Sequence, residues 1–196
     1  MEHKRPTVYT TVNWIINDLN EKRTTSSGKA SLATLRNSAG RPLNASAQVW
    51  PIILDKIPVE FLGTGVGPTS EEMSILMTLQ LFALHQQGKN DTVILKSQEG
   101  KWRNIGFSFS ALRTSEDQVA MDRRFNALIT SSSFEELTHH LRQLIKLLKS
   151  KTKATVDYAK LAEDLFWFLN GYQEGVRLNW ARGYYGTKIK GESENE

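Results

Sequence analysis

The side chains best able to do chemistry in this chain are arginines and lysines that recur at helical spacing. Arg142, Lys146 and Lys149 follow one another at i, i+4 and i+7, so on a helix they form a ridge along one face. Lys29 and Arg36 are seven positions apart and share a face in the same way. Phosphate groups need positive charge and hydrogen-bond donors, and such ridges provide both. The residues predicted to contact a nucleic-acid backbone are Lys29, Arg36, Arg41, Arg113, Arg123, Arg124, Arg142, Lys146 and Lys149.

A single basic ridge is also what an ordinary solvent-exposed helix face shows. Here several ridges occur with few acidic residues between them, and the chain has a net charge of +4. A charge excess of this size favours a polyanionic partner only weakly, so the distribution of the charge carries more weight than its sum. No helix-turn-helix, RRM or zinc-finger pattern accompanies the ridges. We therefore expect contacts to the sugar-phosphate backbone without base-specific reading.

Groups that could bind a metal or act in catalysis are not placed to do so. The chain has no cysteine, which excludes a thiolate metal site and a cysteine nucleophile. His139 and His140 are adjacent, so on a helix they point about 100° apart and cannot share one ion. The pairs Glu71–Glu72 and Glu135–Glu136 fall in first helical turns, where carboxylates offset the helix dipole. We expect no catalytic residue, no metal and no cofactor.

The glycine-rich segment Gly63–Gly67 precedes a helix and could suggest a phosphate-binding loop. The third glycine of a dinucleotide-binding fingerprint would fall on Pro68, and the Lys-Ser/Thr pair of a P-loop is missing. We interpret the segment as a turn before a capped helix. His85, on the apolar helix that follows, is predicted to lie in the core or between two lobes.

Apolar residues at a period of 3.6 predict a chain that is almost entirely α-helical. All five prolines lie at or before residue 68, so the remainder is free to form helices. Capping motifs occur at Thr69–Glu72, Ser115–Gln118 and Ser133–Glu136. The predicted helices cover residues 7–22, 29–38, 69–87, 107–113, 115–130, 133 to at least 148, 158–169 and 176–185.

We expect an all-α fold of two small helical lobes (helical bundles) joined by a loop-rich connection. The predicted units are an N-terminal lobe with the connection at 1–105, a C-terminal bundle at 106–186 and a disordered tail at 187–196. Arg23–Gly28 is expected to be a loop, and the proline-containing region to hold one or two short helical turns. The most apolar stretch, Met73–Leu84, is shorter than the roughly 20 residues of a membrane span. The lack of cysteine and of a signal sequence fits a cytoplasmic location without membrane contact.

Two consecutive motifs resemble the signature of a known family. They are RRFNALI at Arg123–Ile129 and LTHHLRQLI at Leu137–Ile145. Further segments match in the same order at residues 32–36, 81–87, 157–162 and 176–185. Together they resemble the CasB family, the small subunit of Cascade, the type I-E CRISPR surveillance complex.

The resemblance implies a two-lobed helical protein of antiviral defence, without catalysis or a metal, that helps to stabilise the R-loop during guide-RNA-directed recognition of DNA. Its implied partners are the large subunit, the guide-RNA-bearing backbone subunits and a second copy of itself. Nucleic acid is implied as well: the displaced DNA strand and duplex backbone, with RNA as a further candidate. Arg36, Arg123–Arg124 and Arg142 match the family pattern best, and segments 89–103 and 151–153 match it least. The alternative is a structural adaptor whose basic faces dock onto acidic proteins.

Overall fold

The computed structural model describes residues 6–95 and 103–186, and within these residues the secondary structure is helical. Strand-like pairing in this part is limited to isolated bridge residues, among them the parallel pair Ile94 and Val156. The all-α prediction is therefore confirmed. The helices are α1 (Val8–Glu21), α2 (Ser26–Asn37), α3 (Trp50–Ile53), α4 (Ser70–Gln86), α5 (Ile105–Ser110), α6 (Gln118–Ile129), α7 (Phe134–Lys151), α8 (Tyr158–Leu169) and α9 (Gln173–Tyr185).

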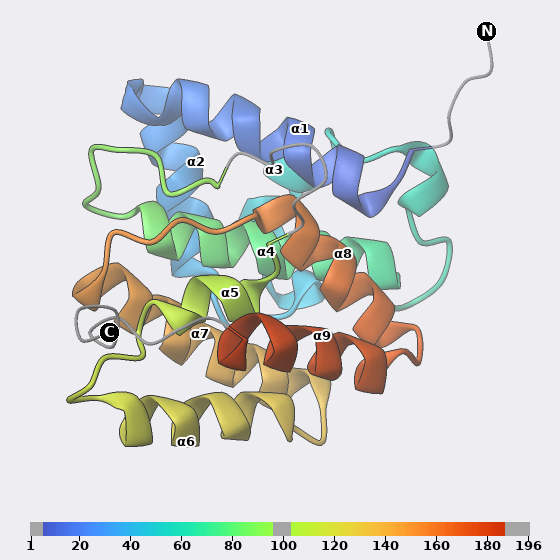
Figure 1. Ribbon diagram of the computed structural model, residues 1–196. Coiled ribbons are helices and arrows are strands. Elements are labelled where there is room, and N and C mark those ends of the chain that lie inside the picture. The colour runs from blue at the N-terminus through green and yellow to red at the C-terminus, as the bar shows by residue number, and fades with distance from the viewer. Residues whose placement is uncertain (1–5, 96–102, 187–196) are drawn as a thin grey trace, which may run out of the picture.

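The central element is α4, which packs against α1, α2, α7 and α8 (Figure 1). Its start is the predicted capping box: the Thr69 backbone N–H donates to Glu72 Oε2 at 2.7 Å, and the Glu72 N–H donates to Thr69 Oγ1 at 3.0 Å. Its end precedes Gly88, whose φ of +72° is the left-handed conformation that stops a helix. Fourteen of its 17 residues are buried, so α4 is enclosed by the other helices rather than covered on one face.

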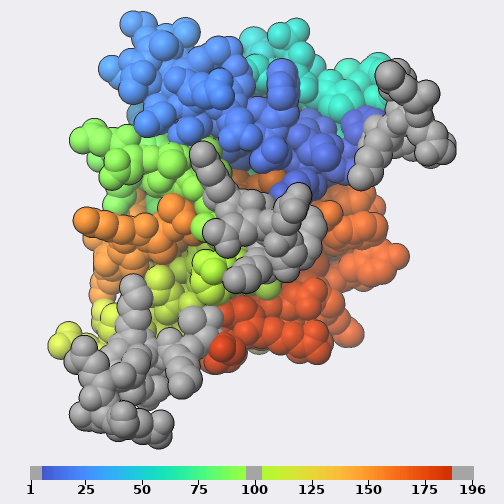
Figure 2. Space-filling model, turned by 45° about the horizontal axis from the view of Figure 1, so that its top comes forward, coloured from blue at the N-terminus to red at the C-terminus, as the bar shows by residue number. Residues whose placement is uncertain are grey.

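The other helices are arranged around α4. α8 packs on α1 and α4, α7 lies between α4 and α6, and α5 packs on α9. Figure 2 shows α1 and α2 at one end of the molecule and α9 towards the other. The buried apolar side chains form a contiguous core from Val8 to Tyr184, which joins the two halves of the chain. The predicted division near residue 105 stays a prediction, and the tail predicted at 187–196 lies outside the described residues.

Several boundaries differ from the predicted ones. α2 begins at Ser26, inside the predicted loop, because the Thr25 hydroxyl accepts a hydrogen bond from the Gly28 N–H at 3.1 Å. Gly28 permits this close turn, since a Cβ there would meet the Lys22 carbonyl oxygen at 1.9 Å. The proline-containing region forms more than the expected one or two turns: besides α3 it holds 3-10 turns at Leu43–Ala45, Ala47–Val49 and Val59–Phe61.

The predicted cap at Ser115 is wrong. α6 begins at Gln118, and its N-cap Asp117 makes no side-chain capping bond. Thr114 replaces the expected cap with a local turn, in which its hydroxyl accepts from the Asp117 N–H at 3.2 Å. A serine three residues before a glutamine therefore does not cap the helix when an upstream threonine bonds the same backbone donors.

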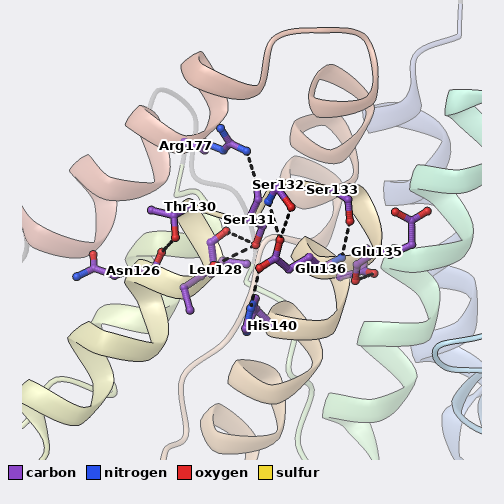
Figure 3. Close-up of polar contacts among 12 residues, drawn as sticks. Asn126, Leu128, Thr130, Ser131, Ser132, Ser133, Glu135, Glu136, His140 and Arg177 are labelled. Atoms are coloured by element: carbon purple, nitrogen blue, oxygen red, sulfur yellow. Dashed lines mark hydrogen bonds and ion pairs between the residues drawn. The ribbon is translucent and has the colours of Figure 1, made fainter.

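Hydrogen bonds at the junction of α6 and α7 fix where α7 begins (Figure 3). The Ser133 hydroxyl caps the helix by accepting from the Glu136 N–H at 3.1 Å. Glu136 Oε2 accepts from the backbone N–H and the hydroxyl of Ser132 at 2.7 and 2.8 Å. The hydrogen bond from the Ser132 backbone N–H, followed by that from its hydroxyl, lowers the pKa of Glu136. Arg177 of α9 donates to the Ser131 carbonyl, so the junction is also tied to α9.

Leu141 tests which face of α7 is buried, because its side chain is fully enclosed. We expect Leu141→Ala to lower the free energy of unfolding by about 2–5 kcal/mol through lost burial and the cavity left behind. Lys146→Ala, on the exposed side of the same helix, should change stability by less than about 0.5 kcal/mol. Urea unfolding of both variants measures the two changes, and equal stabilities would contradict the assignment of the buried face.

The described helices include none that is both long enough and apolar enough to span a bilayer.

Candidate nucleic-acid interface

Cations from separate elements gather around one surface cavity of about 500 Å³, here called the basic pocket. Lys29 and Arg36 reach it from α2, Arg23 from the turn before α2, and Lys89 from the segment after α4. Lys149 of α7 adjoins the pocket, because its Nζ donates to Gln87 Oε1 at 3.0 Å and Gln87 is part of the lining. Lys29 and Arg36 therefore share one face as their spacing predicts, and the structure adds Lys149 to it.

The cations of the basic pocket have no carboxylate partner among the described residues. Arg23 donates to the carbonyl oxygens of Asn20 and Asn90 at 2.9 and 3.4 Å, and Lys89 donates to that of Thr152 at 3.4 Å. Burial, and then the positive charges of Arg36 and Lys89, lower the pKa of Lys149. Like charges held together without a counter-charge favour a bound anion, because each phosphate would reduce their repulsion.

A second basic surface lies between α6 and α7. Arg124 and Lys146 line a cavity of about 590 Å³ whose lining also includes His140. Arg124 stays exposed while its Nη1 donates to the Ala120 carbonyl at 3.3 Å, and Arg123 beside it is exposed as well. Lys146 and Lys149 are three residues apart on α7, so this surface and the basic pocket adjoin along one helix.

Arg41 and Arg142 occupy a different setting. They line a cavity of about 260 Å³ between α4, α7 and the turn after α2, whose other side chains are mostly apolar. Arg142 is half-buried, and its Nη1 and Nε each donate to a backbone carbonyl at 3.4 Å, those of Ala39 and Thr138. Gly40 leaves room for this guanidinium, since a Cβ there would meet Nη1 at 1.9 Å.

Arg113, predicted to contact a nucleic-acid backbone, lies in the core instead. Its side chain is buried, and its Nε donates to Asp122 Oδ1 at 2.8 Å. The guanidinium also lies over the rings of Tyr184 and Tyr185, each at 5.2 Å. It joins α6 to α9 in the core and is not available to a phosphate, because a paired and enclosed cation contacts no external ligand.

Lys89 and Arg23 are members of the basic pocket that the sequence reasoning missed. Lys89 follows the stop at Gly88, so the helical period that identified the other residues does not extend to it. A cation directly after a helix C-terminus is a signal that could have identified it, because the helix dipole favours positive charge there. Lys151, the last residue of α7, pairs with Asp117.

The described residues contain no group of three or more His, Asp and Glu side chains that could bind a metal ion. His139 and His140 lie edge to face with ring centroids 5.5 Å apart.

A family model described as CRISPR-associated protein Cse2 matches residues 31–185. The chain belongs to the Cse2 family. Solved members and relatives share its fold. CasB from Thermobifida fusca is 25% identical with a TM-score of 0.71, and the match covers 91% of this chain and 97% of that one. A Cse2-family protein from Thermus thermophilus is 22% identical with a TM-score of 0.64, over 93% of this chain and 100% of that one.

A chain from a solved CRISPR RNA-guided surveillance complex has the same fold, with a TM-score of 0.67 at 14% identity over 92% of this chain and 94% of that one. No curated protein sequence compared with the chain matches it. The resemblance to the CasB family is thereby confirmed. The residues matched by the family model include the predicted basic residues from Arg36 to Lys149.

His85 lies near the basic pocket and links it to the core of this Cse2 chain. The side chain is buried, and its Nδ1 is 2.8 Å from the Tyr158 hydroxyl. Burial, and then the charges of Lys89 and Lys149, lower the pKa of His85 to about 4. The neutral imidazole is therefore the form that the folded chain accommodates.

The free energy of unfolding should fall as the pH falls between the pKa of His85 in the unfolded chain and its lower pKa in the folded chain. An unfolded histidine has a pKa of about 6.5, so between pH 6.5 and 4 the unfolded chain binds a proton that the folded chain resists. The stability of the parent relative to His85→Gln should decrease by about 3 kcal/mol from pH 7 to pH 4. Urea unfolding across that range measures it, and parallel curves for the two proteins would contradict the assignment.

Proposed function

We propose that this Cse2-family chain is a non-catalytic subunit of the type I-E Cascade complex that binds the nucleic-acid backbone without reading its sequence. The observation that carries the proposal is the basic pocket, where cations from α2, α7 and the segment after α4 lie together and form no ion pair with a described carboxylate. Phosphodiesters are the ligand that such a site suits, because every nucleotide provides one negative charge whatever its base. The likeness in fold to a chain of a CRISPR RNA-guided surveillance complex supports the setting.

The two adjoining basic surfaces suit an extended strand better than a single anion. Lys149 borders the basic pocket and Lys146 lines the α6–α7 surface, so a backbone that follows α7 meets both. Exchange of a DNA strand for guide RNA is nearly balanced in free energy, and contacts to the displaced backbone therefore shift the balance towards the open R-loop. This is the proposed role of the chain: to hold the displaced strand while the guide pairs with its target.

Exposed aromatic and apolar side chains favour a second candidate, a structural adaptor that docks on proteins. Trp14, Tyr172 and Leu178 expose 57, 60 and 52% of their surface. Large apolar side chains at the surface are enriched at protein interfaces, although singly they are ordinary. Gel shifts of the purified chain on duplex DNA, single-stranded DNA and RNA separate the candidates. Absence of binding to all three at low salt would favour the adaptor.

Loss of two cations from the basic pocket should weaken binding to all sequences alike. We expect Arg36→Gln with Lys149→Gln to reduce affinity for single-stranded DNA, because two phosphate contacts are lost. The log–log slope of affinity against salt should become shallower by about 0.7 per lost contact. Fluorescence anisotropy with oligonucleotides of unrelated sequence, at several salt concentrations, measures both quantities.

Arg182→Gln is the control, because it removes one exposed cation of α9 that lines neither basic surface. It should leave the salt slope unchanged. The double variant should unfold like the parent, since Arg36 and Lys149 are half-exposed and pair with no described carboxylate, and such cations contribute little to stability. An unchanged slope in the double variant would remove the basic pocket from the proposed strand path.

The pair Arg123–Arg124 tests the second surface in the assembled complex. Replacing both by alanine should expose the displaced DNA strand to a chemical footprinting reagent, because its backbone loses two cations. Recognition of the short duplex motif beside the target should persist, since the family resemblance assigns it to the large subunit. If the displaced strand is equally protected in the parent and the variant, the pair serves subunit contacts instead.

A further inference from the structure

The cavity between α4, α7 and the turn after α2, here called the apolar pocket, differs in character from the two basic surfaces. Leu43, Leu76 and Phe134 contribute to an apolar lining, together with Met73 and Met77, one turn apart on α4. Two of the four methionines of the chain are thus concentrated here. Methionine is flexible and polarisable, and it adapts to the shape of an inserted apolar group.

Two guanidinium groups border this apolar lining. Arg41 is exposed, and Arg142 is held across Gly40 by the carbonyl oxygens of Ala39 and Thr138. Neither arginine forms an ion pair with a described residue, and Nη2 of Arg142 donates no hydrogen bond to one. Glu135 is the one carboxylate among the described residues of the lining. The border is therefore basic overall and has donors left for an incoming carboxylate.

The size and lining exclude two kinds of occupant. About 260 Å³ is below the range of roughly 300–1,000 Å³ typical of small-molecule pockets, and it is enough for one side chain. A nucleobase would bring several polar atoms against leucine and methionine side chains. The Thr138 hydroxyl, which could serve them, already donates to the Glu135 carbonyl at 3.0 Å. Only polar atoms of a base that stayed at the border could reach Arg41 or Arg142, and those inside the lining would lose hydration without gaining partners, whereas an apolar side chain has no such cost.

The geometry points to a docking site for a protein segment that places one bulky apolar side chain, such as phenylalanine or leucine, beside carboxylates. The apolar side chain fills the pocket between Met73 and Met77, and the carboxylates pair with Arg41 and Arg142. An aromatic or aliphatic anchor that fills a pocket with charged groups at its edge is the usual form of an interface hot spot. This assigns Arg41 and Arg142 to a protein partner and goes beyond the proposed binding of nucleic acid.

Methyl resonances of methionine provide a direct test on the full-length chain. The protein is labelled with methyl-¹³C methionine and titrated with a capped peptide that carries one phenylalanine between aspartates. The resonances of Met73 and Met77 should shift, while that of Met121, buried in α6, should not. Peptides with alanine for phenylalanine, or lysine for aspartate, should shift them at least fivefold less. Equal responses to all three peptides, or no response to the first at millimolar concentration, would overturn the proposal.

Reversing the charge of Arg41 tests whether the peptide's carboxylates pair with the arginines or the peptide binds nonspecifically. Arg41→Glu should weaken binding of the aspartate-flanked peptide at least fivefold and strengthen binding of the lysine-flanked one. Arg182→Glu, the same change on α9, should affect neither peptide. A single-stranded oligonucleotide that shifts Met73 and Met77 while the peptide does not would overturn the proposal and add this pocket to the nucleic-acid path. If the Met73 and Met77 resonances shift as the protein concentration rises without any peptide, a second copy of the chain occupies the pocket and the proposal is overturned.

Discussion

The burial of α4 is the constraint on which the rest of the structure depends. A helix enclosed on nearly all sides must satisfy its polar side chains inside the protein, since an unpaired buried donor costs about 1–3 kcal/mol. Gln80 does so with its donor group: Nε2 donates to the carbonyl and hydroxyl of Ser38 at 2.9 and 3.1 Å, which ties α4 to the end of α2, while Oε1 has no hydrogen-bond partner among the described residues. His85 pairs with Tyr158 at 2.8 Å and ties it to α8. These bonds fix α2 and α8 against α4, and α2 carries Lys29 and Arg36 of the basic pocket.

Three cations of the basic pocket lie where helices end. Arg36 lies in the last turn of α2, Lys149 in that of α7, and Lys89 three residues after α4. The carbonyl ends of helices carry partial negative charge, and each favours a nearby cation by about 0.3–1 kcal/mol. This offsets part of the repulsion among the cations without occupying them, because carbonyl groups leave most guanidinium and ammonium donors free. The fold can thus keep the site positively charged in the absence of a ligand, and a phosphate that binds does not have to break an ion pair first.

The sequence predicts those features that depend on local periodicity. The stripes of α1 and α7 and the capping box of α4 are confirmed, because amphipathic spacing and a hydroxyl–glutamate pair act within one element. Features that depend on tertiary contacts are missed. Arg113 has the same type and charge as the exposed arginines, and only its meeting with Asp122 and Tyr184 places it inside. Lys89 joins the basic pocket through the folding of the chain after Gly88, which no helical period describes.

The three settings of arginine show why positive charge alone does not specify a partner. Arg113 is enclosed and paired with a carboxylate, so its charge serves the core. Arg36 faces other cations, and repulsion among them is relieved by any anion, which favours a repeating polyanion over a single shaped ligand. Arg142 lies beside methionine and leucine side chains, where an anion gains only if it arrives with apolar surface that removes water from the same pocket. Nucleic acid lacks such surface at its backbone, whereas a protein segment can present both groups at once. The lining around each guanidinium, rather than the charge of the chain, therefore decides which class of macromolecule it suits.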